Sequence, residues 1–213
     1  MEASSPRPLS GRRAEAARND ERILNAARAV FVSDPDAPIS AVAKRAGVGI
    51  SALYRRYEGK EELLRRLCAD GLKRYIGAAE AALADTGDPW TAFTGFMSRV
   101  VDADTHSLTL RLAGTFPPTD ELRRDAAKAQ ELNLRLIERT KAAGALRADI
   151  TPDDLSFVFE QLAAVRVGDE QRTAELRRRY LALQLDALHN PNATALPGPP
   201  PTWREISRRW EKK

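Results

Sequence analysis

The residues best suited to chemistry in this 213-residue chain lie close together, between Ser40 and Lys60. Within this stretch the run Gly49-Ile50-Ser51-Ala52 is followed by Tyr54 and Arg55, so small, hydroxyl, phenolic and cationic side chains succeed one another. These side chains are too small or too polar to form the apolar stripe of a core helix. We therefore predict that they form an exposed face that meets a DNA groove.

Two short helices around a tight turn must position this face. We predict one helix over residues 41–46, with Ser40 as its N-cap and Gly47 as the left-handed residue that ends it. A further helix is predicted from about residue 50 to residue 57, with Leu53 and Tyr57 pointing inward. This is the pattern of a helix-turn-helix, in which the second helix lies in the major groove.

The other segments with a regular hydrophobic pattern are also predicted to be helical. The first helix covers about residues 19–33 and ends at Asp34-Pro35-Asp36-Ala37-Pro38, because proline cannot continue a helix. A long fourth helix covers about residues 60–83, and no segment shows the alternation that is typical of a strand. We expect an all-α protein whose later helices cover about residues 89–103, 106–115, 120–143, 152–167 and 170–188.

The chain is expected to have four parts. Residues 1–17 are rich in Arg, Ser and Pro and are predicted to form a flexible basic arm. Residues 18–64 form a three-helix helix-turn-helix domain, which the long helix joins to a helical domain in residues 65–190. Residues 191–213 are a Pro-rich tail, whose Thr202-Trp203-Arg204-Glu205 pattern starts a short helix. We expect this helix to dock on the body or on a partner subunit, since exposed Trp203 and Trp210 would favour aggregation.

Composition and charge exclude several classes of protein. No apolar run approaches the roughly 20 residues of a membrane span, and the N-terminus has no secretory signal, so we expect a cytoplasmic protein. The single Cys68, with only His106 and His189 as other soft ligands, leaves no zinc-site spacing, and we expect no metal or cofactor. Residues 1–75 hold 15 Lys and Arg against 10 Asp and Glu, which suits a polyanion partner, although a solvated basic surface would explain the same count.

The segment from Ile23 to Leu64, about one fifth of the chain, carries four features in a characteristic order and spacing. They are an apolar first helix ending in Phe31, the pattern Ile39-x-x-Val42-Ala43-x-x-Ala46-Gly47-Val48, then Leu53-Tyr54-x-x-Tyr57, and finally Lys60-Glu61-x-Leu63. This segment resembles the N-terminal DNA-binding domain of TetR-family transcriptional regulators. Gly49 stands where a capping serine is frequent in that family, Ser51 where a glycine is frequent, and Tyr57 where phenylalanine usually packs.

The resemblance implies a role for each position of the motif. Ser40 and Tyr54 would hydrogen-bond DNA phosphates, and Lys60 would add a charged phosphate contact at a helix N-terminus. The base edges would be approached by Gly49, Ile50, Ser51, Ala52 and Arg55, with Arg55 able to read guanine. Arg12 and Arg13 in the arm would enter the neighbouring minor groove, whereas Lys44 and Arg56 are either phosphate contacts or solvated charges.

The all-helical remainder fits the ligand-binding and dimerisation domain of the same family. The resemblance implies a pocket for a small-molecule inducer, whose candidate residues are Trp90, Phe93, Phe96, Met97, Leu108, Arg111, Leu112, Phe116, Leu136 and Phe157. Most apolar residues at helical spacing serve as core rather than pocket, and Arg111 either meets an anionic ligand or makes a surface salt bridge.

The last two long helices, within residues 152–188, are predicted to pair with their copies in a homodimer. The candidate interface residues are Phe157, Leu162, Val165, Leu176, Tyr180, Leu183 and Leu188. A dimer would hold two recognition helices about 34–36 Å apart on a double-stranded, pseudo-palindromic operator.

We therefore interpret the sequence as that of a homodimeric transcriptional repressor that a small molecule releases from its operator. An enzyme is the first alternative, but the chain has no Gly-rich phosphate loop and no nucleophile–base constellation, so we expect no catalytic residue. The second is a helical adaptor that uses the helix-turn-helix to bind protein.

Overall fold

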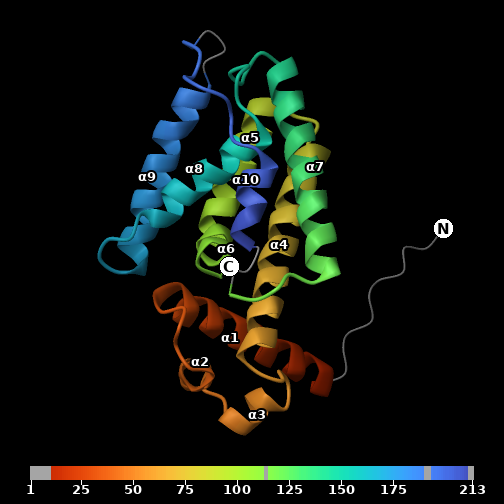
Figure 1. Cartoon of the computed structure of the whole chain (residues 1–213), viewed down its shortest axis with the longest axis vertical. Coiled ribbons are helices and arrows are strands. Elements are labelled where there is room, and N and C mark those ends of the chain that lie inside the picture. Colours follow the sequence, from red (N-terminus) through yellow and green to blue (C-terminus); the bar gives the residue numbers. More distant parts are fainter. Residues whose placement is uncertain (1–10, 113–114, 190–192, 211–213) are drawn as a thin grey trace, which may run out of the picture. The chain divides into compact units, whose positions relative to one another are not determined.

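Helices account for the regular structure of this chain in a computed structural model that describes residues 11–112, 115–189 and 193–210. The described residues form ten α-helices and one short 3-10 helix, with no strand among them (Figure 1). The all-α prediction is confirmed. The chain divides into two compact units, Met1–Leu67 and Cys68–Lys213, and helix α4 (Lys60–Ala84) contributes residues to both.

The first unit contains α1 (Gly11–Ser33), α2 (Ile39–Ala46), α3 (Ile50–Tyr54) and the start of α4. Apolar side chains from all four helices meet in its core. The fully buried members of this core are Ala27, Phe31, Val42, Leu53, Leu63 and Leu67. Helices α2 and α3 are too short to be stable alone, so this shared burial is what holds them in place.

Helix α1 begins at Gly11, earlier than the predicted start near residue 19. Residues 11–17, which we expected in the flexible arm, are therefore helical. The physical reason is composition, because the sequence from Arg12 to Ala17 contains only Arg, Ala and Glu, which are among the best helix formers. The rest of the predicted arm, residues 1–10, lies outside the described residues.

Helix α2 also begins earlier than predicted, and Ser40 is not its N-cap. Pro38 occupies that position in extended geometry (φ −71°, ψ 153°), and its carbonyl accepts a hydrogen bond from the Ala41 amide at 2.9 Å. Proline favours this extended backbone, so the helix starts at Ile39 and Ser40 falls in its first turn. Helix α3 ends at Tyr54 rather than near residue 57.

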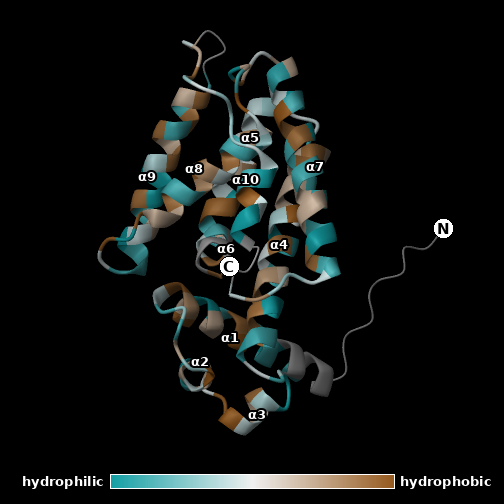
Figure 2. Ribbon diagram, viewed as in Figure 1, coloured by the Kyte–Doolittle hydropathy of each residue, from teal (hydrophilic) through white to brown (hydrophobic). Residues whose placement is uncertain are grey.

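The second unit is a bundle of amphipathic helices, and Figure 2 shows hydrophobic and hydrophilic residues alternating along them. Besides most of α4 it contains α5 (Pro89–Asp102), α6 (Thr105–Leu112), α7 (Asp120–Ala142), α8 (Pro152–Ala164), α9 (Glu170–Leu188), α10 (Trp203–Ser207) and the 3-10 helix η1 (Arg208–Trp210). Tyr75, Phe96 and Phe159 meet edge to face at the centre of the core, with ring centroids 5.4–6.3 Å apart. No helix in the described part of the chain combines the length and apolarity that a membrane span requires.

Side-chain caps fix where several of these helices begin. Asp88, Thr119, Thr151, Asp169 and Thr202 each accept a hydrogen bond from a backbone amide in the first turn of α5, α7, α8, α9 and α10. Each bond satisfies an amide that has no partner within its helix. The capping box predicted at Thr202 and Glu205 is present, and it starts the short C-terminal helix.

Candidate DNA-reading surface and ligand cavity

The turn between α2 and α3 depends on Gly47, which has a left-handed backbone (φ 65°, ψ 35°). The amides of Gly47 and Val48 donate to the carbonyls of Lys44 and Ala43, at 3.3 and 3.1 Å. Arg22 of α1 donates to the carbonyl of Ala46 at 2.8 Å, so a cation also satisfies the end of α2. These bonds fix the direction in which the chain enters α3.

Helix α3 is held by its inner face, which leaves the predicted reading face exposed. Leu53 is fully buried, whereas Ile50 and Tyr54 are 39% and 54% exposed. Gly49 is the N-cap of the helix, in extended geometry. The remaining predicted base-reading residues, Ser51, Ala52 and Arg55, are exposed with it, and so is the predicted phosphate ligand Ser40. The structure thus brings the predicted contacts of α3 together on one short helix.

Asp20 of α1 ties down the segment that follows α3. Its carboxylate accepts a hydrogen bond from the Tyr57 hydroxyl at 3.0 Å and pairs with the Arg56 guanidinium. Burial, together with the nearby Asp20 charge, raises the pKa of Tyr57 to about 12. The hydroxyl that distinguishes Tyr57 from phenylalanine therefore has a partner, and Arg56, which we left open, belongs to an ion pair.

Lys60, predicted to bind a phosphate, lies half-buried at the start of α4. Its ammonium donates to the carbonyl of Pro35 at 2.8 Å and lies 5.2 Å from the centre of the Phe31 ring. An ammonium has three donors, so these contacts leave capacity for a phosphate oxygen. The side chains of Arg12 and Arg13, the predicted minor-groove residues, lie outside the described residues.

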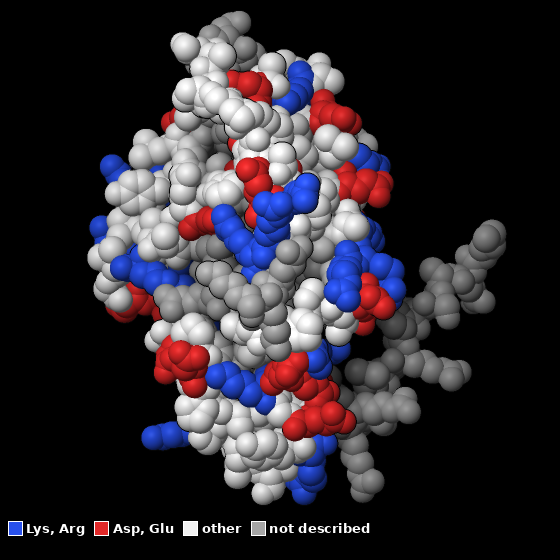
Figure 3. All heavy atoms as spheres, in the orientation of Figure 1, with Lys and Arg blue, Asp and Glu red and all other residues white. Residues whose placement is uncertain are grey.

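Charge on the surface is mixed rather than separated by sign. On the face shown in Figure 3, Lys and Arg side chains are interspersed with Asp and Glu side chains. Some charged side chains pair within one helix, such as Arg65 with Glu61 and Arg74 with Asp70 in α4.

The second unit contains a cavity of about 630 Å³ that is partly open to solvent. Its wall combines apolar residues of α4 and α7, such as Leu72, Leu122 and Ala126, with polar residues, most of them uncharged. The Tyr75 hydroxyl donates to Asn133 Oδ1 at 2.9 Å, which leaves the Asn133 amide hydrogens as donors. A cavity of this size lies within the range of small-molecule sites, roughly 300–1,000 Å³.

Two ionisable side chains on the cavity wall are held in their neutral forms. Burial lowers the pKa of His106 to about 4, and the nearby Arg209 adds to the effect. Burial raises the pKa of the Cys68 thiol to about 12. Neither side chain therefore brings a charge to the cavity near neutral pH.

None of the nine predicted pocket residues whose side chains the structure describes lines this cavity. Phe93, Phe96, Met97, Leu108, Leu112, Phe116 and Leu136 are buried at 2% exposure or less, and they form core contacts instead. Trp90 stacks on His189 with ring centroids 4.2 Å apart, and Phe157 lies beneath the Arg209 guanidinium. The side chain of Arg111 lies outside the described residues. Helical periodicity identified buried faces, but it could not tell which of them border empty space.

Sequence reasoning missed the residues that do form the wall, among them Tyr75, His106, Asn133 and Glu160. One signal was available, because Asn133 interrupts an apolar face of α7 between Leu132 and Leu136. A polar residue on such a face requires a buried partner. His106 lies in the first turn of α6 and lines the cavity.

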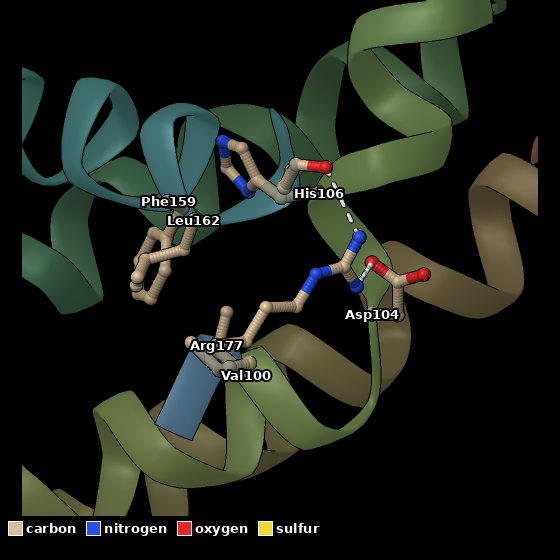
Figure 4. A pocket seen from close by; sticks show the side chains of 8 residues that line it. Val100, Asp104, His106, Phe159, Leu162 and Arg177 are labelled. Atoms are coloured by element: carbon tan, nitrogen blue, oxygen red, sulfur yellow. Dashed lines mark hydrogen bonds and ion pairs between the residues drawn. The ribbon is translucent and has the colours of Figure 1, made fainter. Parts of the chain in front are cut away.

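A second buried polar cluster lies around Arg177 of α9, close to His106 (Figure 4). The guanidinium pairs with Asp104 at 2.7 Å and donates to the carbonyls of Ala163 and Val165 at 3.0 and 3.2 Å. Asp104 has a left-handed backbone (φ 47°), and this ion pair stabilises that turn between α5 and α6. Arg177 therefore joins α9 to the end of α8 and to the start of α6.

The predicted dimer residues divide into three groups by exposure. Tyr180 and Leu183 of α9 are 45% and 56% exposed, and Val167, in the connection between α8 and α9, is 56% exposed. In contrast, Leu162 and Leu188 are 2% and 5% exposed, so they belong to the core of the unit and cannot form an interface. The others, Phe157, Val165 and Leu176, are partly exposed.

The fold and these sites define a class of protein: a DNA-binding regulator with a helix-turn-helix unit and a separate helical unit that contains a cavity. The family profile of bacterial regulatory proteins of the tetR family matches residues 23–67. The profile of the SbtR-like transcriptional regulator C-terminal domain matches residues 88–190. The chain belongs to the TetR family of transcriptional regulators.

Solved structures agree with this assignment. A TetR transcriptional regulator from Streptomyces coelicolor is 26% identical, with a TM-score of 0.57 over 82% of this chain and 99% of its own. A second, from Mycobacterium vanbaalenii, is 25% identical, with a TM-score of 0.57 over 83% of this chain and 98% of its own. The TetR-like regulator LfrR of Mycobacterium smegmatis, solved with proflavine, shares the fold at 23% identity. Its TM-score is 0.61 over 84% of this chain and 99% of its own. None of the curated proteins compared by sequence matches significantly.

Proposed function

We propose that this protein is a homodimeric, non-enzymatic repressor that binds a pseudo-palindromic operator and leaves it when a small molecule binds the cavity. One observation carries the DNA-binding half: α3 is anchored by buried Leu53 while its face from Gly49 to Arg55 is exposed. Because its family is one of bacterial regulatory proteins, whose operators lie in the cytoplasm, we place the protein there as well.

The reading face is proposed to divide its contacts by chemistry. Ser40, Tyr54 and the free donors of Lys60 bind phosphates and fix the position of α3. Arg55 reads guanine, while Ile50 and Ala52 meet thymine methyl groups, with Gly49 and Ser51 allowing close approach to the bases. Arg12 and Arg13 at the start of α1 are proposed to reach the adjacent minor groove.

Regulation is proposed to depend on the second unit. The exposed side chains of Tyr180 and Leu183 on α9 support pairing of two copies, because large apolar residues on one helix face favour an interface. A ligand in the cavity then shifts the population towards a dimer whose two α3 helices no longer fit successive grooves. The strength of this switch equals the difference in ligand affinity between the DNA-bound and free dimers.

Selection of bound sequences from random DNA tests the DNA-binding proposal. We expect a pseudo-palindromic consensus, bound with an affinity that falls steeply as salt rises, because phosphate contacts release counterions. An Arg55→Ala variant should lose about 1–3 kcal/mol of discrimination at one base pair, whereas Tyr54→Phe should weaken binding to all sequences alike. A selection that yields no palindrome would refute the repressor, and binding of a protein partner that is insensitive to salt would favour the adaptor.

A further inference from the structure

The C-terminal segment of the chain forms one wall of the cavity. Trp203, Ile206, Ser207 and Arg209 all line it, together with residues of α4, α7 and α8. Ile206 is 9% exposed, so α10 is packed against the unit rather than detached from it (Figure 1). The family profile that matches the second unit ends at residue 190, so this wall lies beyond the matched part of the chain.

The segment is fixed to the second unit near both of its ends. At the start, Arg147 donates to the carbonyl of Thr194 at 2.8 Å, and the Leu196 amide donates to Asp149 at 2.9 Å. Arg147 and Asp149 also pair with each other, with the Nε to Oδ1 distance at 2.6 Å. At the far end, Arg209 pairs with Glu160 of α8.

A proline-rich connection joins these two anchors. Pro197 and the run from Pro199 to Pro201 restrict the backbone, so the connection is stiff even before α10 docks. Less conformational entropy is then lost when the helix takes its place on the cavity. The connection therefore holds α10 in position as one wall of the cavity.

The charges around the cavity are paired with one another. Glu160 faces Arg209, and Arg123 lies 3.3 Å from Asp120 at the solvent-exposed edge. His106 is neutral near pH 7, as described above, and the other polar groups on the described wall are uncharged. A charged ligand would find a counter-ion inside only by breaking the Arg209–Glu160 pair, which leaves the displaced partner unpaired.

We propose that α10 completes the ligand site and that Ile206, with the Arg209–Glu160 pair, makes this site selective for an uncharged, predominantly apolar ligand. Such a ligand would place its apolar surface against Leu72 and Ile206. A polar acceptor on it would reach the Asn133 amide. This inference rests on the proposed function, since it takes the cavity as the regulatory site. Ligand binding and docking of the C-terminal segment are then coupled, and each strengthens the other.

The test measures binding of two fluorescent probes to the full-length protein: uncharged, apolar Nile red and the anion 8-anilinonaphthalene-1-sulfonate. Ala126→Trp places an indole ring in the cavity, where it takes the space of a bound ligand, and should abolish Nile red binding. Ile206→Ser removes the apolar contact of α10 and should weaken Nile red by about tenfold or more, as loss of a buried isoleucine side chain implies. Circular dichroism checks that both variants remain helical.

Charge selectivity is tested by Glu160→Gln, which leaves Arg209 without its partner. This variant should bind the anionic probe about tenfold more tightly and Nile red about as well as the wild type. Glu80→Gln is the matched control, since Glu80 also pairs between two helices, with Lys128 at 2.7 Å, but does not line the cavity. It should change neither affinity.

Each outcome decides one question. If Ile206→Ser binds Nile red like the wild type while Ala126→Trp does not bind it, the cavity binds ligand but α10 is no part of the site, and the inference is wrong. If Ala126→Trp also binds normally, the cavity is not the site and the inference fails with it. These measurements use no DNA and test the ligand site alone. A selection that yields no operator would contradict the proposed function independently of them.

Discussion

Arg177 provides the sharpest test of how the second unit is held together, because its neighbour Arg178 is a natural control. Both arginines lie on α9, and each pairs with an aspartate near the end of α5. The Arg177 side chain is 8% exposed and its partner Asp104 29%, whereas Arg178 and Asp102 are 60% and 48% exposed. We compare Arg177→Met with Arg178→Met, since methionine keeps an unbranched apolar stem and a high helix propensity.

The two substitutions should lower the free energy of unfolding by amounts that differ several-fold. Removing one partner of a buried ion pair costs about 3–5 kcal/mol, and the partial exposure of Asp104 places Arg177→Met near the lower end. The carbonyls of Ala163 and Val165 lose their donor as well. An exposed pair contributes about 1 kcal/mol or less, which is the expected cost of Arg178→Met. For a protein of this size, about 3 kcal/mol lowers Tm by roughly 6–12 °C, against less than about 4 °C for the control.

Thermal unfolding followed by circular dichroism measures this difference. Both variants are compared at one protein concentration, and light scattering verifies that their oligomeric state is the same, because association shifts Tm. If Arg177→Met lowers Tm no more than Arg178→Met does, the buried cluster does not hold α9, and the reasoning from burial is wrong.

Two further predictions concern the polar groups found in each unit. Tyr57→Phe removes the hydrogen bond to Asp20 and should lower the free energy of unfolding by about 1 kcal/mol, as urea denaturation would measure; an unchanged midpoint would show that this hydroxyl contributes nothing. The folded-state pKa of His106 lies near 4, below the ordinary value of 6.5, so the unfolded chain takes up this proton first as the pH falls. The free energy of unfolding should therefore be unaffected by His106 above pH 6.5 and should decrease as the pH falls from 6.5 towards 4. In His106→Gln the urea midpoint should change less with pH over that interval than in the wild type. If the midpoint falls equally in both proteins, His106 is not the group that titrates.

The helix-turn-helix unit shows how far local chemistry determines structure. Gly47 was predicted to be left-handed because few residues tolerate that backbone, and it has φ 65°. Buried Leu53 and Tyr57 also follow from helical spacing. The predicted N-cap of α2 was wrong because Pro38 and Ser40 are both able to precede a helix and lie two residues apart. Pro38, in extended geometry, is the N-cap.

The second unit shows where the same reasoning stops. Capping residues and glycine or proline breaks gave the helix boundaries, and the buried state of Phe93, Phe96 and Leu136 followed from their spacing. The cavity did not follow, because it depends on which faces of α4, α7 and α8 fail to fill the space between them. Arg209 lines the cavity because the C-terminal segment returns to α8, where Arg209 pairs with Glu160, 49 residues away in sequence.

The sequence by itself determined which segments are helical and which face of α3 is exposed, because helix periodicity, capping and a left-handed glycine are properties of neighbouring residues. It also determined that the excess positive charge lies in the N-terminal part of the chain. Only the tertiary structure decided which residues line the cavity, which arginines are buried and which apolar residues of α9 remain exposed. These properties depend on contacts between residues far apart in the chain, and no local pattern specifies them.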